Sequence, residues 1–136
     1  MGGKEAVAVP NRRKLKIAGM SEARYLELLN FCMQYGEKKD ELRSMTFLTN
    51  GEGGGRSGRV SRPTEEIALR RARLETDIGM IEASAVEAGG VVVAPFILKN
   101  VTEKMHYRVL GNVPCGINQF YRMRRRFFEI LDSKKR

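Results

Sequence analysis

The sequence predicts an all-α protein: a helical hairpin followed by a C-terminal helix-turn-helix, with a flexible basic N-terminal tail and a Gly/Arg-rich loop. The clearest observation is the amphipathic pattern of residues 116–136, GINQFYRMRRRFFEILDSKKR. A helix advances about 100° per residue, so side chains three and four positions apart share a face. The apolar face carries Phe120, Met123, Phe127, Ile130 and Leu131. The opposite face carries Asn118, Arg122, Arg125, Arg126 and Glu129.

Length and charge narrow the class of protein. A chain of 136 residues with 42% apolar residues forms one domain with a modest core. Lys and Arg number 25 against 16 acidic residues, which gives a net charge of +9. The positive charge is clustered, with +5 in residues 116–136 and +4 in each of 1–20 and 56–73. Clustered positive charge favours a polyanionic partner, either nucleic acid or an anionic membrane surface.

The chain carries no recognisable targeting segment. No apolar run approaches the roughly eighteen residues of a membrane span, and the N-terminus lacks the apolar core of a secretory signal. Cys32 and Cys115 stand far apart in the sequence and are expected to be free thiols in a reducing cytoplasm. We therefore expect a cytoplasmic protein that does not bind a membrane.

The first half of the chain divides into three segments. Residues 1–19 form a basic tail, either a disordered extension or a flexible arm that adds DNA contacts through Arg12, Arg13 and Lys14. Residues 20–48 form an N-terminal helical segment that begins after the N-cap Ser21, runs to about Met45 and would split at Gly36. Residues 49–62 form a Gly/Arg-rich linker, or a loop that becomes ordered on a polyanion. Its arginines, candidates for auxiliary DNA contacts, are Arg56, Arg59 and Arg62.

Residues 63–136 contain a middle helix and the C-terminal unit. The middle helix begins at Pro63 and ends at Gly89–Gly90, and it serves either as the hairpin partner of the first helix or as a dimerisation helix. The valines that follow suggest a strand, whereas Pro95 suggests the start of another helix. We predict a helix over 94–104, a short helix over 105–111, a turn over 112–116 and a last helix over 117–132.

The sequence offers little for catalysis. His106 is the single histidine, and neither it nor the cysteines have a second ligand type at metal-binding spacing. A Cys115–His106 nucleophile pair would lack a group to orient the histidine. We therefore expect no enzyme activity, no metal and no cofactor.

The C-terminal pattern points instead to DNA. In a helix-turn-helix the second helix presents its early residues to base edges in the major groove. Asn118, Gln119 and Arg122 would occupy that position, because Asn and Gln suit adenine and Arg suits guanine. The expected phosphate contacts are Arg125, Arg126, Lys134, Lys135 and Arg136. The turn NVPCG is about two residues longer than the commonest spacing of this motif.

The segment VPCGINQFYRMRRRFFEIL resembles the C-terminal signature of small phage and prophage regulators of the RinA/ArpU type. The earlier helices of that group are similar to two further segments of this chain, YLELLNFCMQY and IALRRARLETDIGMIEASAVEA. The matching positions near the end are Phe120, Tyr121, Arg124, Arg125, Phe127, Phe128 and Leu131. The resemblance implies a sigma-region-4-like helix-turn-helix that activates phage late genes in a bacterial host. The helical phase turns Arg124 toward the apolar side, which predicts a structural ion pair for it.

The residues therefore predict a sequence-specific, double-stranded DNA-binding transcriptional regulator that could form a homodimer, and the resemblance implies that it acts with bacterial RNA polymerase. Two alternatives remain. A small terminase-like packaging protein would also be basic, helical and DNA-binding, but it would assemble into a ring. A polymerase adaptor would bind no duplex at low salt.

Overall fold

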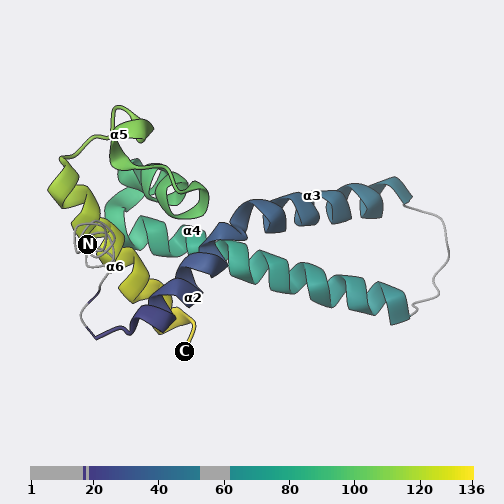
Figure 1. The fold of residues 1–136 in the computed structure, drawn as a ribbon. Coiled ribbons are helices and arrows are strands. Elements are labelled where there is room, and N and C mark those ends of the chain that lie inside the picture. Colours follow the sequence, from purple (N-terminus) through teal and green to yellow (C-terminus); the bar gives the residue numbers. More distant parts are fainter. Residues whose placement is uncertain (1–16, 18, 53–61) are drawn as a thin grey trace, which may run out of the picture.

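The computed structural model describes residue 17 and the ranges 19–52 and 62–136, and this part of the chain contains helices and no β-strand (Figure 1). The predicted all-α class is confirmed. The helices are α2 (Glu22–Met33), α3 (Tyr35–Glu52), α4 (Arg62–Glu103), α5 (Tyr107–Leu110) and α6 (Ile117–Lys134).

The molecule consists of a helical body and a projecting arm (Figure 1). The arm is an antiparallel hairpin of α3 and the first part of α4, which lie side by side. Lys38 of α3 pairs with Asp77 of α4 at 2.9 Å, and Arg70 of α4 pairs with Glu41 of α3. The hairpin predicted for the middle helix is therefore present.

The first predicted helix is divided at a different residue from the one expected. Ser21 caps α2 as predicted, since its hydroxyl oxygen accepts from the backbone N–H of Arg24 at 3.1 Å. The break falls at Gln34, whose backbone N–H donates to the carbonyl of Phe31 at 3.2 Å. Gly36 lies inside α3, so its low helix propensity did not set the boundary. α3 then continues to Glu52, past the predicted start of the linker at 49.

Gly89–Gly90 kinks the middle helix instead of ending it. Gly90 has φ 82° and ψ 166°, a region of backbone space that is essentially restricted to glycine. Helix resumes at once, so the valines at 91–93 are helical and the predicted start at 94 was too late. A Cβ on Gly89 would lie 2.8 Å from Cδ1 of Ile97, so the close packing at the bend also requires glycine. We call residues 62–89 the first limb of α4 and residues 91–103 the second limb.

The core lies where α2, α6 and the two limbs of α4 on either side of the bend meet. α6 contributes Phe120, Phe127 and Leu131, which are fully buried as predicted, together with Phe128. Met123 and Ile130 are only partly buried. α2 contributes Tyr25, Leu28 and Cys32, and the second limb contributes Ile97 and Val101, all of them at most 1% exposed.

α4 also has the length and composition of a membrane span, contrary to the expectation from the sequence. Within Thr64–Glu103 one stretch is long and apolar enough to cross a bilayer by composition alone. In this fold 39% of that stretch is buried inside the protein, and the kink at Gly90 interrupts it. A core helix of a globular protein has the same composition.

The kink makes a prediction about stability. We expect Gly90→Ala to lower the free energy of unfolding by about 1–3 kcal/mol, because alanine must adopt the strained conformation of Gly90. Gly79→Ala is the matched control: Gly79 lies within the first limb with open space around its Cα, so alanine should stabilise the protein by up to about 1 kcal/mol. Urea unfolding monitored by circular dichroism measures both. Equal effects would show that the bend at Gly90 is not required.

Candidate nucleic-acid interface

An aromatic cluster fixes the rotation of α6 about its own axis. The ring of Phe120 lies 5.5 Å from Tyr107 of α5 and 5.4 Å from Tyr121. Further along, Phe128 contacts both Phe127 and Tyr25 of α2, each at 5.0 Å between ring centroids. Edge-on and tilted aromatic contacts of this kind add directional energy to the burial of the rings. The side of α6 that faces solvent is therefore set by the core.

That solvent-facing side is a polar and cationic stripe. All six of its members are exposed, and we call them the α6 stripe: Asn118, Gln119, Arg122, Arg125, Arg126 and Glu129. Arg122, Arg125 and Arg126 form no ion pair or hydrogen bond with any residue that the structure describes. The structure thus places together the base-contacting and phosphate-contacting residues that the sequence assigned to this helix, apart from its last three.

The beginning of α6 adds to this positive surface. Gly116 is the N-cap and provides no side chain to bind the first backbone N–H groups, and the first turn contains no acidic residue. A helix N-terminus carries a partial positive charge and free N–H donors. Asn118 and Gln119 therefore extend from the end of the helix that attracts anions.

The segment before α6 is compact but only partly helical. The predicted short helix over 105–111 is reduced to α5, Tyr107–Leu110, and the turn begins at Gly111, one residue before its predicted start. The Tyr107 hydroxyl donates to the carbonyl of Cys115 at 2.5 Å, which ties α5 to the end of the turn. The amide nitrogen of Asn100 donates to the carbonyl of Met105 at 2.9 Å. The second limb of α4, α5 and α6 are thus joined by short, hydrogen-bonded connections.

The three basic residues at the end of the chain have partners inside the protein. Lys134 pairs with Glu87 of α4 at 2.7 Å, and Arg136 pairs with Asp132 at 2.9 Å. Lys135 places its ammonium group 4.0 Å from the centroid of the Phe31 ring. These predicted phosphate contacts are therefore less free than the arginines of the α6 stripe.

Arg124 has a structural position, as its helical phase indicated, but its partners are neutral. Its Nε donates to the side-chain oxygen of Asn100, and its Nη2 donates to the Tyr25 hydroxyl at 2.8 Å. Its guanidinium also lies 5.0 Å from the Phe128 ring. The ion pair that we predicted is absent from the interactions of Arg124 within the described residues, where hydrogen bonds and ring contacts take its place.

The auxiliary DNA contacts cannot be placed. Arg12, Arg13, Lys14, Arg56 and Arg59 lie outside the described residues, as do the basic tail and most of the predicted linker. Arg62 is the first residue of α4, and its side chain is not described.

Other reactive groups do not converge on a site. Among the described residues, no three His, Cys, Asp or Glu side chains could share a metal ion. Both cysteines are free thiols, and burial raises the pKa of Cys32 to about 12 despite nearby Arg124, Lys135 and Lys38. Such a thiol is protonated at neutral pH and is therefore a poor nucleophile. His106 is exposed at the start of α5.

Comparisons with known proteins provide no identification. No protein-family model matches the chain. No curated protein and no solved structure matches it. The resemblance to RinA/ArpU-type regulators therefore stays a prediction that rests on the residues themselves.

The neighbours Arg124 and Arg125 should differ sharply in their effect on stability. Arg124→Ala should cost about 1–3 kcal/mol of unfolding free energy, because Asn100 and Tyr25 each lose a charged hydrogen-bond partner. Arg125→Ala should change it by no more than about 0.5 kcal/mol, because Arg125 is exposed and has no partner in the described part of the chain. Urea unfolding of both variants measures the difference. A stable Arg124→Ala protein would contradict the structural role of Arg124.

Proposed function

We propose that this protein is a sequence-specific double-stranded DNA-binding regulator that activates phage late genes together with bacterial RNA polymerase, in the cytoplasm of the host. The observation that carries the proposal is the α6 stripe, in which three arginines without partners among the described residues lie on one face of a firmly packed helix. An exposed cluster of unpaired arginines is expected where a protein binds an anionic polymer.

The dimensions of the stripe suit the major groove. A helix with its side chains is about 10–12 Å across, which is close to the roughly 12 Å width of the major groove of B-DNA, and the stripe from Asn118 to Arg126 extends about 12 Å along the helix. A helix that enters the groove with its N-terminus would bring Asn118, Gln119 and Arg122 to the base edges. Arg125 and Arg126 would then lie nearer the phosphates at the rim of the groove.

The short connections around α5 support a helix-turn-helix arrangement. In this motif the first helix braces the second across the DNA backbone. We assign the bracing role to the second limb of α4, which packs against α6, and the recognition role to α6. Residues 104–116, which include α5, connect these two helices, so this unit would be a variant with a long connection.

The two classes of arginine make different predictions for DNA binding. Arg125→Ala should weaken binding to all duplexes alike and reduce the slope of log K against log salt by about one, because one phosphate contact is lost. Arg122→Ala should instead relax discrimination between a selected and a random duplex by about 1–3 kcal/mol. Fluorescence anisotropy titrations from low to high salt measure both quantities.

Arg43→Ala is the matched control, since it removes the same charge from an exposed position on α3 in the arm. Its salt slope should equal that of the wild type. An unchanged slope for Arg125→Ala would remove Arg125 from the phosphate contacts. Equal losses of Arg122→Ala on both duplexes would reassign Arg122 to a phosphate. Absence of duplex binding by the wild type at low salt would favour the polymerase adaptor.

We further propose that the arm forms a homodimer contact. Leu69 is 61% exposed and Ile67 is 48% exposed near the start of the first limb, where apolar side chains lie uncovered by the described part of the chain. Burial of such side chains against a second copy would be favourable by about 1.5–3 kcal/mol for each. The proposed contact with RNA polymerase would then fall on the body, where Val91 and Val92 are exposed.

Light scattering tests the assembly. The wild type should have a mass in solution of twice the 15.4 kDa of one chain, and Leu69→Glu should reduce this mass to that of one chain. Val92→Glu, which adds the same charge to the body, should leave the mass unchanged. A monomeric wild type would contradict the dimer contact, whereas a mass of eight or more chains would favour the terminase-like alternative.

A further inference from the structure

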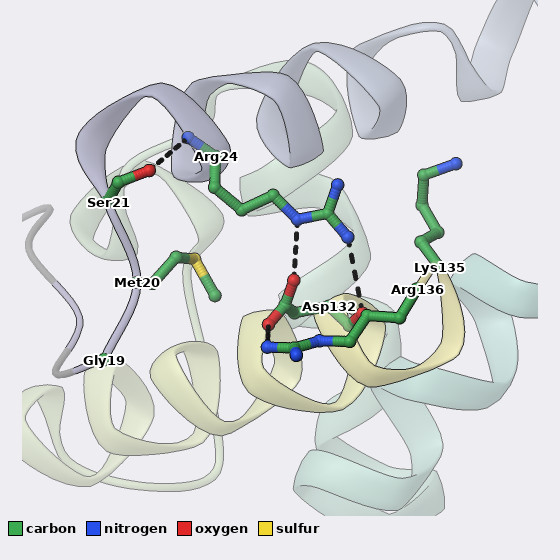
Figure 2. A pocket seen from close by; sticks show the side chains of 7 residues that line it. All are labelled: Gly19, Met20, Ser21, Arg24, Asp132, Lys135 and Arg136. Carbon is green, nitrogen blue, oxygen red and sulfur yellow. Dashed lines mark hydrogen bonds and ion pairs between the residues drawn. The ribbon is translucent and has the colours of Figure 1, made fainter.

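A polar pocket lies between the beginning of α2 and the end of α6 (Figure 2). It has a volume of about 440 Å³. Seven residues line it, two of them from the end of the chain beyond the last turn of α6. These residues are Gly19, Met20, Ser21, Arg24, Asp132, Lys135 and Arg136. These two segments are distant in the sequence, and only the fold brings them together.

Asp132 orients two guanidinium groups at this pocket. Its Oδ1 accepts from Nε of Arg24 at 2.6 Å, and its Oδ2 accepts from Nη2 of Arg136 at 2.9 Å (Figure 2). Nη2 of Arg24 also approaches the backbone oxygen of Asp132 at 3.4 Å. Each guanidinium has five N–H donors, so both retain donors for another acceptor. The Arg136 and Arg24 groups hold the pKa of Asp132 below its usual range, so the carboxylate is ionised at neutral pH.

The charges around the pocket favour an anion. Three basic side chains and one carboxylate line it, which leaves a net charge of +2. The N-terminal end of α2, with its partial positive charge, begins at the pocket and carries Glu22 in its first turn. Glu27 lies at its edge, where its carboxylate pairs with Nη1 of Arg24 at 3.3 Å and is largely exposed to solvent.

The pocket continues the α6 stripe along the helix. Asp132 follows Arg125 by seven residues, which is two helical turns and a rotation of only about 20°. The distance along the axis is therefore about 10 Å. Over this distance the pocket and Arg125 would contact different phosphates of the duplex.

We propose that this pocket binds one phosphate of the DNA backbone, through Arg24 and Arg136, and thereby anchors the C-terminal end of α6 on the duplex. The inference rests on the proposed function, since it assumes that the α6 stripe binds DNA. Its new element is Arg24, a residue of α2 that brings the body of the protein into the interface. Two N–H donors of a guanidinium group match the geometry of two phosphate oxygens. Asp132 acts as a positioning residue that holds the guanidinium groups of Arg24 and Arg136 in place.

A methylphosphonate scan tests this site one phosphate at a time. The duplex is one selected from random sequence by the wild-type protein, and each phosphate in turn is replaced by a neutral methylphosphonate. Wild-type affinity should fall roughly tenfold at the pocket phosphate, the loss expected for a charged hydrogen bond. Arg136→Ala and Arg24→Gln should bind the unmodified duplex more weakly. Their affinity should no longer fall when the pocket phosphate is replaced by methylphosphonate. Arg125→Ala should become insensitive at a different position, and the arm control Arg43→Ala should retain the wild-type pattern.

Arg24→Gln removes a pair that joins α2 to α6 and could unfold part of the protein, so Arg136→Ala is the decisive variant. A second measurement separates the DNA backbone from a free phosphate. Inorganic phosphate is added to the DNA-free protein at constant ionic strength, with chloride as the reference, and amide NMR shifts at Ser21, Arg24 and Arg136 are followed.

The outcomes are distinct. If the protein binds the duplex but the methylphosphonate effect at every position is independent of Arg24 and Arg136, this inference is overturned and the proposed function stands. Phosphate-induced shifts without such a position would assign the pocket to a free phosphate and would also overturn it. No duplex binding by the wild type would overturn the proposed function and this inference together.

Discussion

The rest of the structure depends on the burial of the aromatic face of α6 against α2 and the second limb of α4. Phe120, Phe127 and Phe128 have no exposed surface, and their rings contact Tyr107 and Tyr25 at about 5 Å. Because these rings are closely packed, α6 cannot rotate about its own axis without opening a cavity in the core. The same contacts that stabilise the body therefore hold the arginines of the α6 stripe on the solvent side. Stability and the candidate interface share one physical origin.

The glycine pair at 89–90 gives the molecule its two parts. The first limb begins in the arm and reaches the core of the body with Ile81 and Ala85, and the bend at Gly90 then lets the second limb pack in the body as well (Figure 1). Without the bend, the two limbs would be collinear, and the second limb would leave the aromatic face of α6 uncovered. The close approach of Gly89 to Ile97 and Val93 shows that the bend is itself packed and not an open hinge.

The arginines of α6 show how position decides the role of a side chain. Arg124 lies half-buried, where the amide of Asn100 and the hydroxyl of Tyr25 satisfy its donors. Arg125 and Arg126 are one and two residues further, and both are exposed with no partner among the described residues. A buried guanidinium requires fixed partners because burial removes its hydration. An exposed guanidinium keeps its hydration until a ligand replaces the water. Arg125 and Arg126 are therefore available to bind a ligand, whereas Arg124 is not.

The sequence alone determined the all-α class, the apolar face of residues 117–132 and the separation of Arg124 from the α6 stripe, because helical periodicity is local. It did not determine that Gln34, and not Gly36, divides α2 from α3, or that Gly90 bends the middle helix instead of ending it. Those outcomes depend on packing between segments distant in the sequence. Tertiary structure alone brought Arg24 within 2.6 Å of Asp132, across 108 residues, and gave the last three basic residues their internal partners. Periodicity specifies the face on which a residue lies, but only the folded chain specifies what that face meets.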